Sequence, residues 1–323
     1  MTLFIISKIL LILLLLALRV GFFTLIERKV LSYIQSRKGP NKVGIIGLPQ
    51  PLADAAKLFS KERIFINLSN KPSFLAAPIR AVIIIFILWN IYRSSFGLTI
   101  FKLRILFFLV ISRINVYTIL LSGWASNSKY SLLGSIRAIA QTISYEVRIA
   151  LVLITILILT ITFNLNELPK HQFIGFLAIS IPLFFIWFIR CLAETNRAPF
   201  DLAEGESELV SGFNIEYGGG EFAFLFIAEY GRILLIRLLT VTLFLSGITT
   251  TYGWDMIVKL LIIAYFYLWI RGSYPRIRYD TLIRLTWKTF LSLSISITFI
   301  LIIIWCFINT KYINLPSLKS IIR

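Results

Sequence analysis

Residues 143–163 read ISYEVRIALVLITILILTITF, a stretch with only two charged side chains. A helix of about 20 apolar residues is long enough to cross the hydrocarbon core of a bilayer. Seven other stretches have a similar character, and they cover residues 3–26, 74–91, 100–122, 173–193, 222–245, 257–271 and 286–308. The sequence therefore predicts an all-α integral membrane protein, a bundle of about eight transmembrane helices that forms a single membrane domain over residues 1–323.

The composition excludes several other classes of protein. Hydrophobic residues make up 58% of the chain and the mean hydropathy is +0.86, so too few polar residues remain to cover a soluble protein. The formal charge of +18 does not indicate nucleic-acid binding, because the basic residues flank the apolar stretches. Two cysteines and one histidine are too few for an iron–sulfur cluster or a structural zinc site. We therefore expect any redox cofactor to belong to a neighbouring subunit.

The basic residues concentrate in alternate loops, and the loop between the first two apolar stretches, residues 27–73, is the most basic. The positive-inside rule places such loops on the side of the membrane that corresponds to the cytoplasm. With an even number of spans, both termini are then expected on the opposite side.

A surface helix is predicted within the loop 27–73. Pro49 is a suitable helix opener, and Leu52, Ala55, Ala56 and Phe59 recur at the spacing of one helical face. This pattern predicts a short amphipathic helix on the membrane surface. A connector packed on the protein explains it about equally well.

Acidic residues gather in one region that is flanked by apolar stretches. Eight of the fifteen acidic residues lie there: Glu194, Asp201, Glu204, Glu206, Glu208, Glu216, Glu221 and Glu229. Carboxylates so close to one another and to a membrane should titrate as a coupled group, some with raised pKa values. This pattern indicates a site that stores or moves protons.

The order of these acids suggests how they face one another. If residues 201–208 are helical, Asp201, Glu204 and Glu208 share one face and Glu206 is turned away. A solvated loop that offsets the basic loops is the alternative, and a calcium loop has the wrong spacing. Glu146 and Glu229, in or beside apolar stretches, extend the series and favour the coupled site.

The wider function classes stay open at this point. A free-standing proton or cation transporter would usually show internal repeats, which we do not find. A structural anchor for a peripheral enzyme would not need the acids. Arg197, Arg276 and Arg278 could pair with the acids or donate hydrogen bonds to a polar ligand.

Several motifs closely resemble NADH dehydrogenase subunit 1, the family of membrane subunits that border the quinone site of respiratory complex I. The resemblance spans almost the whole chain, and it rests on ERKV at 27–30, QSRKGPN at 35–41, QTISYE at 141–146, AETNR at 193–197, DLAEGESELVSGFN at 201–214 and YPRIRYD at 274–280. A related family, the membrane subunits of energy-converting hydrogenases, shares this ancestry.

The resemblance implies a site of two parts and a place in the cell. Ubiquinone would be the substrate, in a chamber supported by Arg28, Arg37, Asp54, Phe59 and Arg276. The acidic path toward the proton-pumping subunits would comprise Glu146, Glu194, Arg197, Asp201, Glu204, Glu206, Glu208, Glu216 and Glu229, and residues 194–221 would be the coupling loop on the matrix side. FMN and iron–sulfur clusters would lie in partner subunits of the peripheral arm, and the membrane would be the mitochondrial inner membrane.

Five arginines depart from this pattern. Arg19, Arg113, Arg148, Arg232 and Arg237 lie inside predicted spans, where an arginine costs about 2.5–3.5 kcal/mol. The resemblance implies small uncharged residues there, often serine. Because invertebrate mitochondrial codes read AGA and AGG as serine, we hypothesise that some of the five are serine in the protein. The alternative is that they pair with the acidic path.

Overall fold

The computed structural model describes residues 2–63, 67–91, 103–160, 162–165, 167–168, 172, 175–202, 205, 212–245 and 254–313. Helices are the only regular secondary structure in these ranges. Six helical segments among them are long and apolar enough to cross a membrane. These segments are α1 (Thr2–Ile34), α3 (Lys71–Trp89), α4 (Arg104–Ala125), α5 (Lys129–Thr160), α10 (Trp254–Ser273) and the continuous run of α11 (Tyr279–Arg284), the π-helical turn η4 (Leu285–Phe290) and α12 (Leu291–Ile313). The predicted all-α membrane fold is confirmed.

The other two predicted spans are helical, but one of them is interrupted and the other contains charged residues. The stretch predicted at 173–193 forms α6 (Phe176–Ile179) and α7 (Ile181–Glu194), which are separated at Ser180. Pro182 explains this break, since it has no amide hydrogen to continue the helical ladder. The stretch predicted at 222–245 forms α9 (Gly219–Thr240) and the π-helical turn η3 (Val241–Leu245). Two acids and two arginines lie within α9.

Helix α1 extends further than the apolar stretch 3–26 predicts. It continues to Ile34, so Arg28 and Lys29 lie on the helix rather than in a loop. The apolar residues after Lys29 sustain the helix, and it ends where Ser36 and Gly39 adopt positive φ angles of 57° and 64°.

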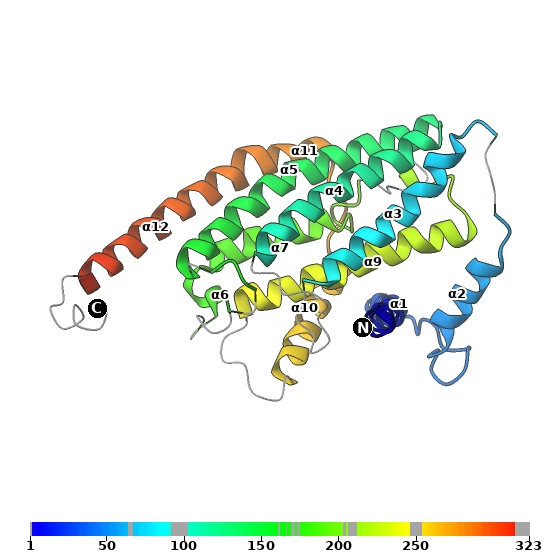
Figure 1. Cartoon of the computed structure of the whole chain (residues 1–323), viewed down its shortest axis with the longest axis horizontal. Helices are drawn as coiled ribbons and strands as arrows, with labels where there is room; N and C mark the ends of the chain where they lie inside the picture. Colours follow the sequence, from blue (N-terminus) through cyan, green and yellow to red (C-terminus); the bar gives the residue numbers. More distant parts are fainter. Residues whose placement is uncertain are drawn as a thin grey trace.

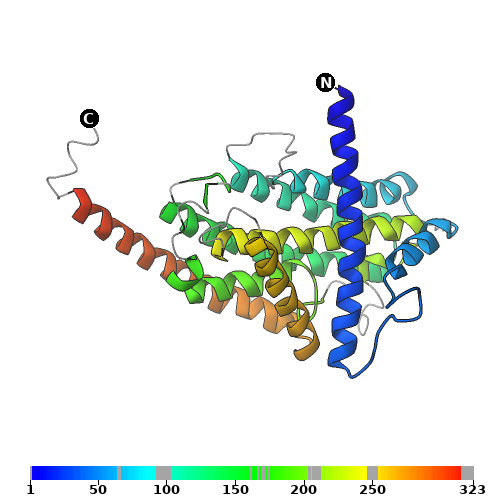
Figure 2. The ribbon, with the colours of Figure 1, turned by 90° about the horizontal axis from the view of Figure 1, so that it is seen from below.

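The long helices form a layered bundle that α1 crosses. Helices α3, α4, α5, α9 and α12 run side by side in Figure 1, where α1 is seen end-on, and Figure 2 shows α1 passing across α9. The main core lies between α5, α7, α9 and α10, around Tyr145, Trp187 and Phe244. A smaller cluster joins Leu16 and Val20 of α1 to Tyr230 of α9.

The predicted surface helix is present as α2 (Gln50–Ser60), which follows Pro49. Its apolar side chains Leu52 and Phe59 are 61% and 57% exposed, whereas Asp54 and Leu58 are half-buried against the bundle. An uncovered apolar face suits a helix in the membrane interface. Its position in the membrane stays a prediction.

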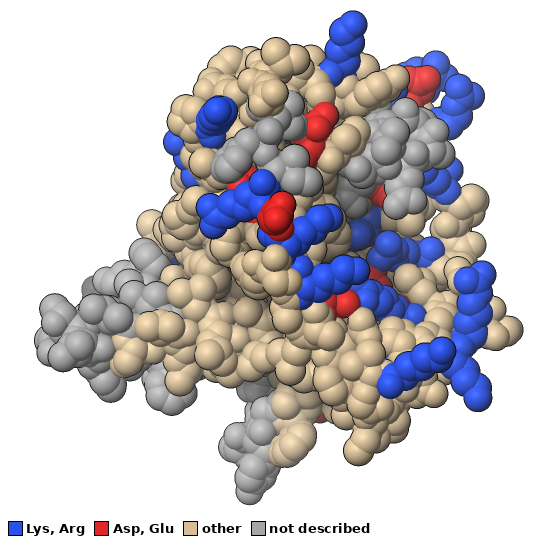
Figure 3. Space-filling model, turned by 90° about the vertical axis from the view of Figure 1, so that its right-hand side faces the viewer, with Lys and Arg blue, Asp and Glu red and all other residues tan. Residues whose placement is uncertain are grey.

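The charged loops gather at one end of the bundle. This end holds the C-termini of α7 and α10 and the N-termini of α3, α5, α9 and α11. Figure 3 shows many Lys and Arg side chains and fewer acids on it. We refer to it below as the charged end.

Candidate functional site

A buried ion-pair network lies at the C-terminal end of α7. Glu194 is 3% exposed, and its Oε2 atom accepts a hydrogen bond from Nη2 of Arg190 at 2.5 Å. Its Oε1 atom lies 3.5 Å from Nε of Arg232, which comes from α9. Because a buried carboxylate without a partner costs several kcal/mol, two guanidinium groups are a strong compensation. The network therefore fixes α7 against α9.

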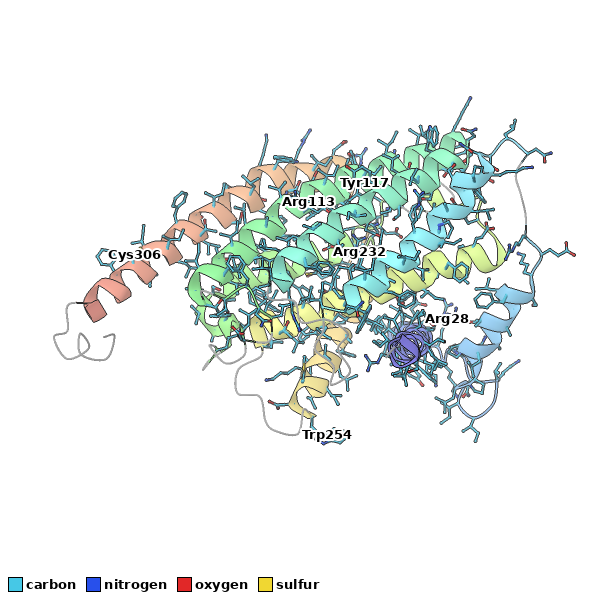
Figure 4. All side chains as sticks on the ribbon, in the orientation of Figure 1. Arg28, Arg113, Tyr117, Arg232, Trp254 and Cys306 are labelled. Atoms are coloured by element: carbon cyan, nitrogen blue, oxygen red, sulfur yellow. The ribbon has the colours of Figure 1, made fainter. Side chains whose placement is uncertain are left out.

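A narrow cavity of about 40 Å³ adjoins this network. Glu194, Glu229 and Arg232 line one part of it, and Asn115 and Thr118 of α4 line another. The Asn115 side-chain oxygen, with its amide oriented to accept, lies 2.8 Å from Nη1 and 3.1 Å from Nη2 of Arg232. Arg232 accordingly lies between α9 and α4 in Figure 4. The cavity has polar walls and room for about three water molecules.

The loop after α7 is tied to the same cavity. Arg197 lies in this loop, and its Nη2 atom is 3.6 Å from Oε2 of Glu229 on α9. Its guanidinium also lies 4.6 Å from the ring centroid of Tyr230. The start of the acidic region is thus held beside the cavity.

Glu146 lies on α5, near this network. It is buried, and its Oε1 atom has no hydrogen-bond partner among the described residues. Glu194, Arg232 and Arg190 are close enough to act on it electrostatically. The carboxylate of Glu146 therefore lies within the electrostatic reach of the Glu194 network.

The acidic region is anchored at its first end by α5. Nε2 of Gln141 donates to the carbonyl oxygens of Ala193 and Phe200 at 2.8 and 3.0 Å. The backbone amide of Ile277 donates to the Pro199 carbonyl at 3.0 Å. The two Gln141 bonds tie the acidic region to α5, and the Ile277 bond ties it to the segment between α10 and α11.

The second end of the acidic region is anchored by the short 3₁₀ turn η2 (Gly212–Asn214) and by Tyr217. The Tyr217 ring stacks on Phe74 of α3 with centroids 4.2 Å apart, and its hydroxyl lies 3.4 Å from the carbonyl oxygens of Phe74 and Ser122. Burial, and then the charge of Glu221, raises the pKa of the Tyr217 phenol. The phenol therefore remains a hydrogen-bond donor.

The residues predicted to support a quinone chamber lie partly together. Nη1 of Arg28 on α1 is 2.6 Å from Oδ2 of Asp54 on α2, and Gln50 donates to Oδ1 of Asp54 at 2.8 Å. Phe59 packs edge-on against Phe224 of α9 with centroids 6.0 Å apart. Helix α2 is therefore held on one side by α1, through Arg28 and Asp54, and on another by α9, through Phe59 and Phe224.

The other two predicted chamber residues lie apart from this contact. Arg37 is exposed after the end of α1. Arg276 lies beside the acidic region, since its guanidinium occupies the space that a side chain at Gly205 would need.

The outcome for the predicted acidic path is mixed. Glu194, Arg197 and Glu229 meet at the cavity, with Glu146 nearby, while Glu216 is half-buried in the turn before α9. Glu204, Glu206 and Glu208 lie outside the described residues. The supposed helix over 201–208 is wrong where it can be followed, because Asp201, Leu202 and Gly205 are not helical. Asp201 is half-buried at the end of this anchored segment.

The comparison with protein families gives a direct match. The model of the family described as NADH dehydrogenase matches residues 7–303. The chain belongs to the NADH dehydrogenase family.

Relatives in this family are similar over most of their length. NADH-ubiquinone oxidoreductase chain 1 of Heterololigo bleekeri is 48% identical over 289 residues, which is 88% of this chain and 92% of the relative. The protein of the same name from Aedes aegypti is 48% identical, over 90% and 92% of the two chains. That of Paracentrotus lividus is 49% identical, over 86% and 88%.

Three contacts of charged side chains in this member of the NADH dehydrogenase family were not predicted from the sequence. Arg190 stands four residues before Glu194, a spacing that brings helical side chains together and could have revealed it. Asn115 is polar within an apolar stretch, but nothing local indicates Arg232 as its partner. Glu27 of α1 pairs with Arg271 of α10, and this contact depends on the packing of the two helices.

Proposed function

We propose that this chain is the core membrane subunit of a proton-pumping NADH:ubiquinone oxidoreductase. In this role it forms part of the wall of the quinone chamber and holds the acidic path that couples quinone reduction to proton translocation. Relatives named NADH-ubiquinone oxidoreductase chain 1, about 48% identical over most of the chain, support the assignment to this enzyme. The observation that carries the coupling role is the polar cavity that joins Glu194, Glu229 and Arg232 inside an apolar bundle.

The quinone would enter where α1, α2 and α9 meet. Arg28 and Asp54 supply charged and hydrogen-bonding groups there, and the exposed side chains of α2, such as Phe59, supply apolar wall. Arg37 and Arg276 complete the predicted set from the loops. Ubiquinone is the substrate in this proposal, while FMN and iron–sulfur clusters in the peripheral-arm subunits carry the electrons. This chain contributes binding, geometry and electrostatics.

The acids would respond to the reduction of the quinone. A quinone that gains two electrons takes up two protons to become a quinol, so nearby acids lose protons or feel a change of charge. Glu194 and Glu229 share one cavity, and water within it would pass a proton between them. Glu146, on which Glu194 acts electrostatically, would be the next acid of the path. In the acidic coupling loop, Asp201, Glu204, Glu206, Glu208 and Glu216 would link the chamber to this path, and Arg197 would hold it in place.

The proposed setting is the mitochondrial inner membrane, with several spans. The charged end would face the matrix and dock the peripheral-arm subunits that carry the quinone-reducing centre. Both termini would lie on the side of the intermembrane space. Neighbouring membrane-arm subunits would receive the protons from the acidic path.

The variant Glu229→Gln tests this proposal. It keeps the shape of the side chain and removes its proton exchange, so proton pumping by the assembled complex should fall by at least about tenfold. Pumping is measured with a pH-sensitive dye in vesicles, and assembly is followed on native gels. Glu167→Gln, in a loop outside the cavity, is the matched control and should keep full activity. Pumping at the parent rate in Glu229→Gln would contradict the role of the cavity.

A further inference from the structure

Side chains of two other helices converge on Gly231, which lies in α9 between Glu229 and Arg232 of the small cavity. A Cβ atom at position 231 would lie 3.0 Å from Cγ1 of Ile85 on α3 and 3.6 Å from Cδ2 of Leu16 on α1. Carbon atoms normally pack at about 3.5–4.0 Å from one another. Because glycine is otherwise unfavourable inside a helix, this close approach explains its presence here.

Trp89, the last residue of α3, makes a hydrogen bond at the same point, where α3 runs beside α9 (Figure 1). Its Nε1 atom donates to the carbonyl oxygen of Gly231 at 3.2 Å. A tryptophan at the end of a membrane helix commonly turns its N–H group toward headgroups or water. The acceptor of the Trp89 bond is instead the carbonyl of a buried residue. Trp89 therefore ties α3 to α9 inside the bundle.

Helix α3 is also one wall of the small cavity. Four of its residues line this cavity, namely Ala81, Ile84, Ile85 and Leu88. Consecutive residues of an α-helix point about 100° apart, so Gly231 can face α3 while Glu229 and Arg232 face the cavity beside it. The contact at Gly231 therefore sets the direction in which these two charged side chains point.

A small rotation of α9 would be enough to displace Glu229. A helix with its side chains has a radius of about 5–6 Å, so a rotation of about 20° moves the end of a side chain by about 2 Å. Oε2 of Glu229 lies 3.6 Å from Nη2 of Arg197, and a movement of this size would break that ion pair. Because proton transfer needs groups within hydrogen-bond reach, the rotation of α9 decides whether Glu229 can exchange a proton.

We propose that Trp89 is a positioning residue of the acidic path. Its hydrogen bond to Gly231 fixes the rotation of α9, and it thereby holds the carboxylate of Glu229 beside Arg197 and toward the cavity. Trp89 is not among the residues that line the cavity, so it acts on the path through α9. This role rests on the function proposed above, in which Glu229 carries protons.

Carbodiimide labelling of the assembled complex reports the surroundings of Glu229 separately from pumping. Dicyclohexylcarbodiimide reacts with a carboxyl group that holds its proton, and mass spectrometry of the peptide with Glu229 gives the labelled fraction at each pH. The charged groups near Glu229 are Arg197 in the loop after α7, with Glu194 and Arg232 in the same cavity. Helices α3 and α4 contribute uncharged side chains to the described lining. The reference variant Arg197→Gln should move half-maximal labelling to higher pH by about 1 unit, since it removes the guanidinium that favours the ionised carboxylate.

The variant Trp89→Phe removes the indole N–H group and keeps an aromatic ring. Half-maximal labelling of Glu229 should move in the same direction as in Arg197→Gln, by at least about 0.5 pH unit, because the ion pair is weakened. Pumping should fall by at least about threefold, since small misplacements of a reacting group are costly. Added to Glu229→Gln, the variant Trp89→Phe should cause no further loss of pumping.

A second variant and a control make the result independent of one substitution. Gly231→Ala pushes α3 and α9 apart while Trp89 is kept, and it should shift the labelling of Glu229 as Trp89→Phe does. Trp124→Phe changes an exposed indole on α4 and should alter neither labelling nor pumping.

The labelling profiles decide the proposal in complexes that assemble like the parent on native gels. A parent-like profile in either Trp89→Phe or Gly231→Ala would overturn it, as would a further loss of pumping when Trp89→Phe is added to Glu229→Gln. A shifted profile with pumping at the parent rate would support the effect of Trp89 on Glu229 and contradict the proton-carrying role of Glu229 itself. The two failures are therefore distinguishable.

Discussion

The guanidinium groups inside the bundle differ in what they contact. Arg190 and Arg232 reach the carboxylate of Glu194. Arg148 and Arg237 are equally buried but rest on aromatic rings, with Arg148 5.0 Å from the Tyr145 centroid and Arg237 4.0 Å from that of Phe23. The three side-chain nitrogens of Arg148 have no hydrogen-bond partner among the described residues. Cation–π contact offsets only part of the cost of such burial.

This difference sharpens the serine hypothesis. We expect peptide mass spectrometry of the natural protein to find serine at positions 148 and 237, where no described carboxylate compensates the charge. The peptide across 232–237 also reports on position 232, where Glu194 and Asn115 do compensate it. Arginine masses at 148 and 237 would end the hypothesis.

The Arg190–Glu194 pair gives a second prediction. Arg190→Met leaves the buried carboxylate of Glu194 with one charged partner and should destabilise the subunit by about 3–5 kcal/mol. The variant Glu194→Gln alone removes the carboxylate partner of both Arg190 and Arg232. The double variant should therefore lose less than the sum of the two single variants. The measurement is the melting temperature of the assembled complex, and additive losses would show that the pair is not coupled.

At the scale of elements, α5 organises the site. It carries Glu146 beside the network and Gln141 at the first end of the acidic region. It also carries Gly134, against which the turn η2 packs. A Cβ atom at position 134 would lie 2.9 Å from Cα of Gly212, a distance that backbone atoms cannot accept without moving. One helix thus sets both ends of the acidic region relative to the cavity.

Gly134→Ala should therefore displace η2 and lower quinone-coupled proton pumping several-fold, while the helix itself gains about 0.5–1 kcal/mol in propensity. Pumping and the rate of NADH oxidation are measured together on the assembled complex. Gly220→Ala is the control, because its Cβ would meet only ordinary contacts at 3.6 Å. Equal activity of the two variants would mean that the close approach at Gly134 has no role in coupling.

At the scale of the whole molecule, the apolar surface has to be covered. Large side chains such as Leu10, Ile83, Val110 and Phe299 are exposed on the outer faces of their helices. A bilayer and neighbouring subunits supply that cover for a membrane protein. The charged end is the part of the molecule that is compatible with water and with docking of a peripheral arm (Figure 3).

The coupling role of the loop at this end can be tested on the assembled complex. Glu204→Gln and Glu208→Gln should lower coupled turnover by about tenfold or more and affect assembly much less. Their positions lie outside the described residues, so the expectation rests on the sequence. Glu62→Gln, an exposed acid at the same end, is the control. Pumping like that of the parent complex in both variants would remove the loop from the proton path.

The sequence by itself determined the helical membrane fold and the short amphipathic helix after Pro49, and it singled out the acids on which the proposed function rests. Each of these depends on local hydropathy or on spacing within one helix. Only the tertiary structure decided that Arg232 and Asn115 join Glu194, that α1 crosses the other helices, and that Asp201 is not helical. These features depend on which faces of distant helices meet, and an apolar helix carries little information in its sequence about the neighbour that it will pack against.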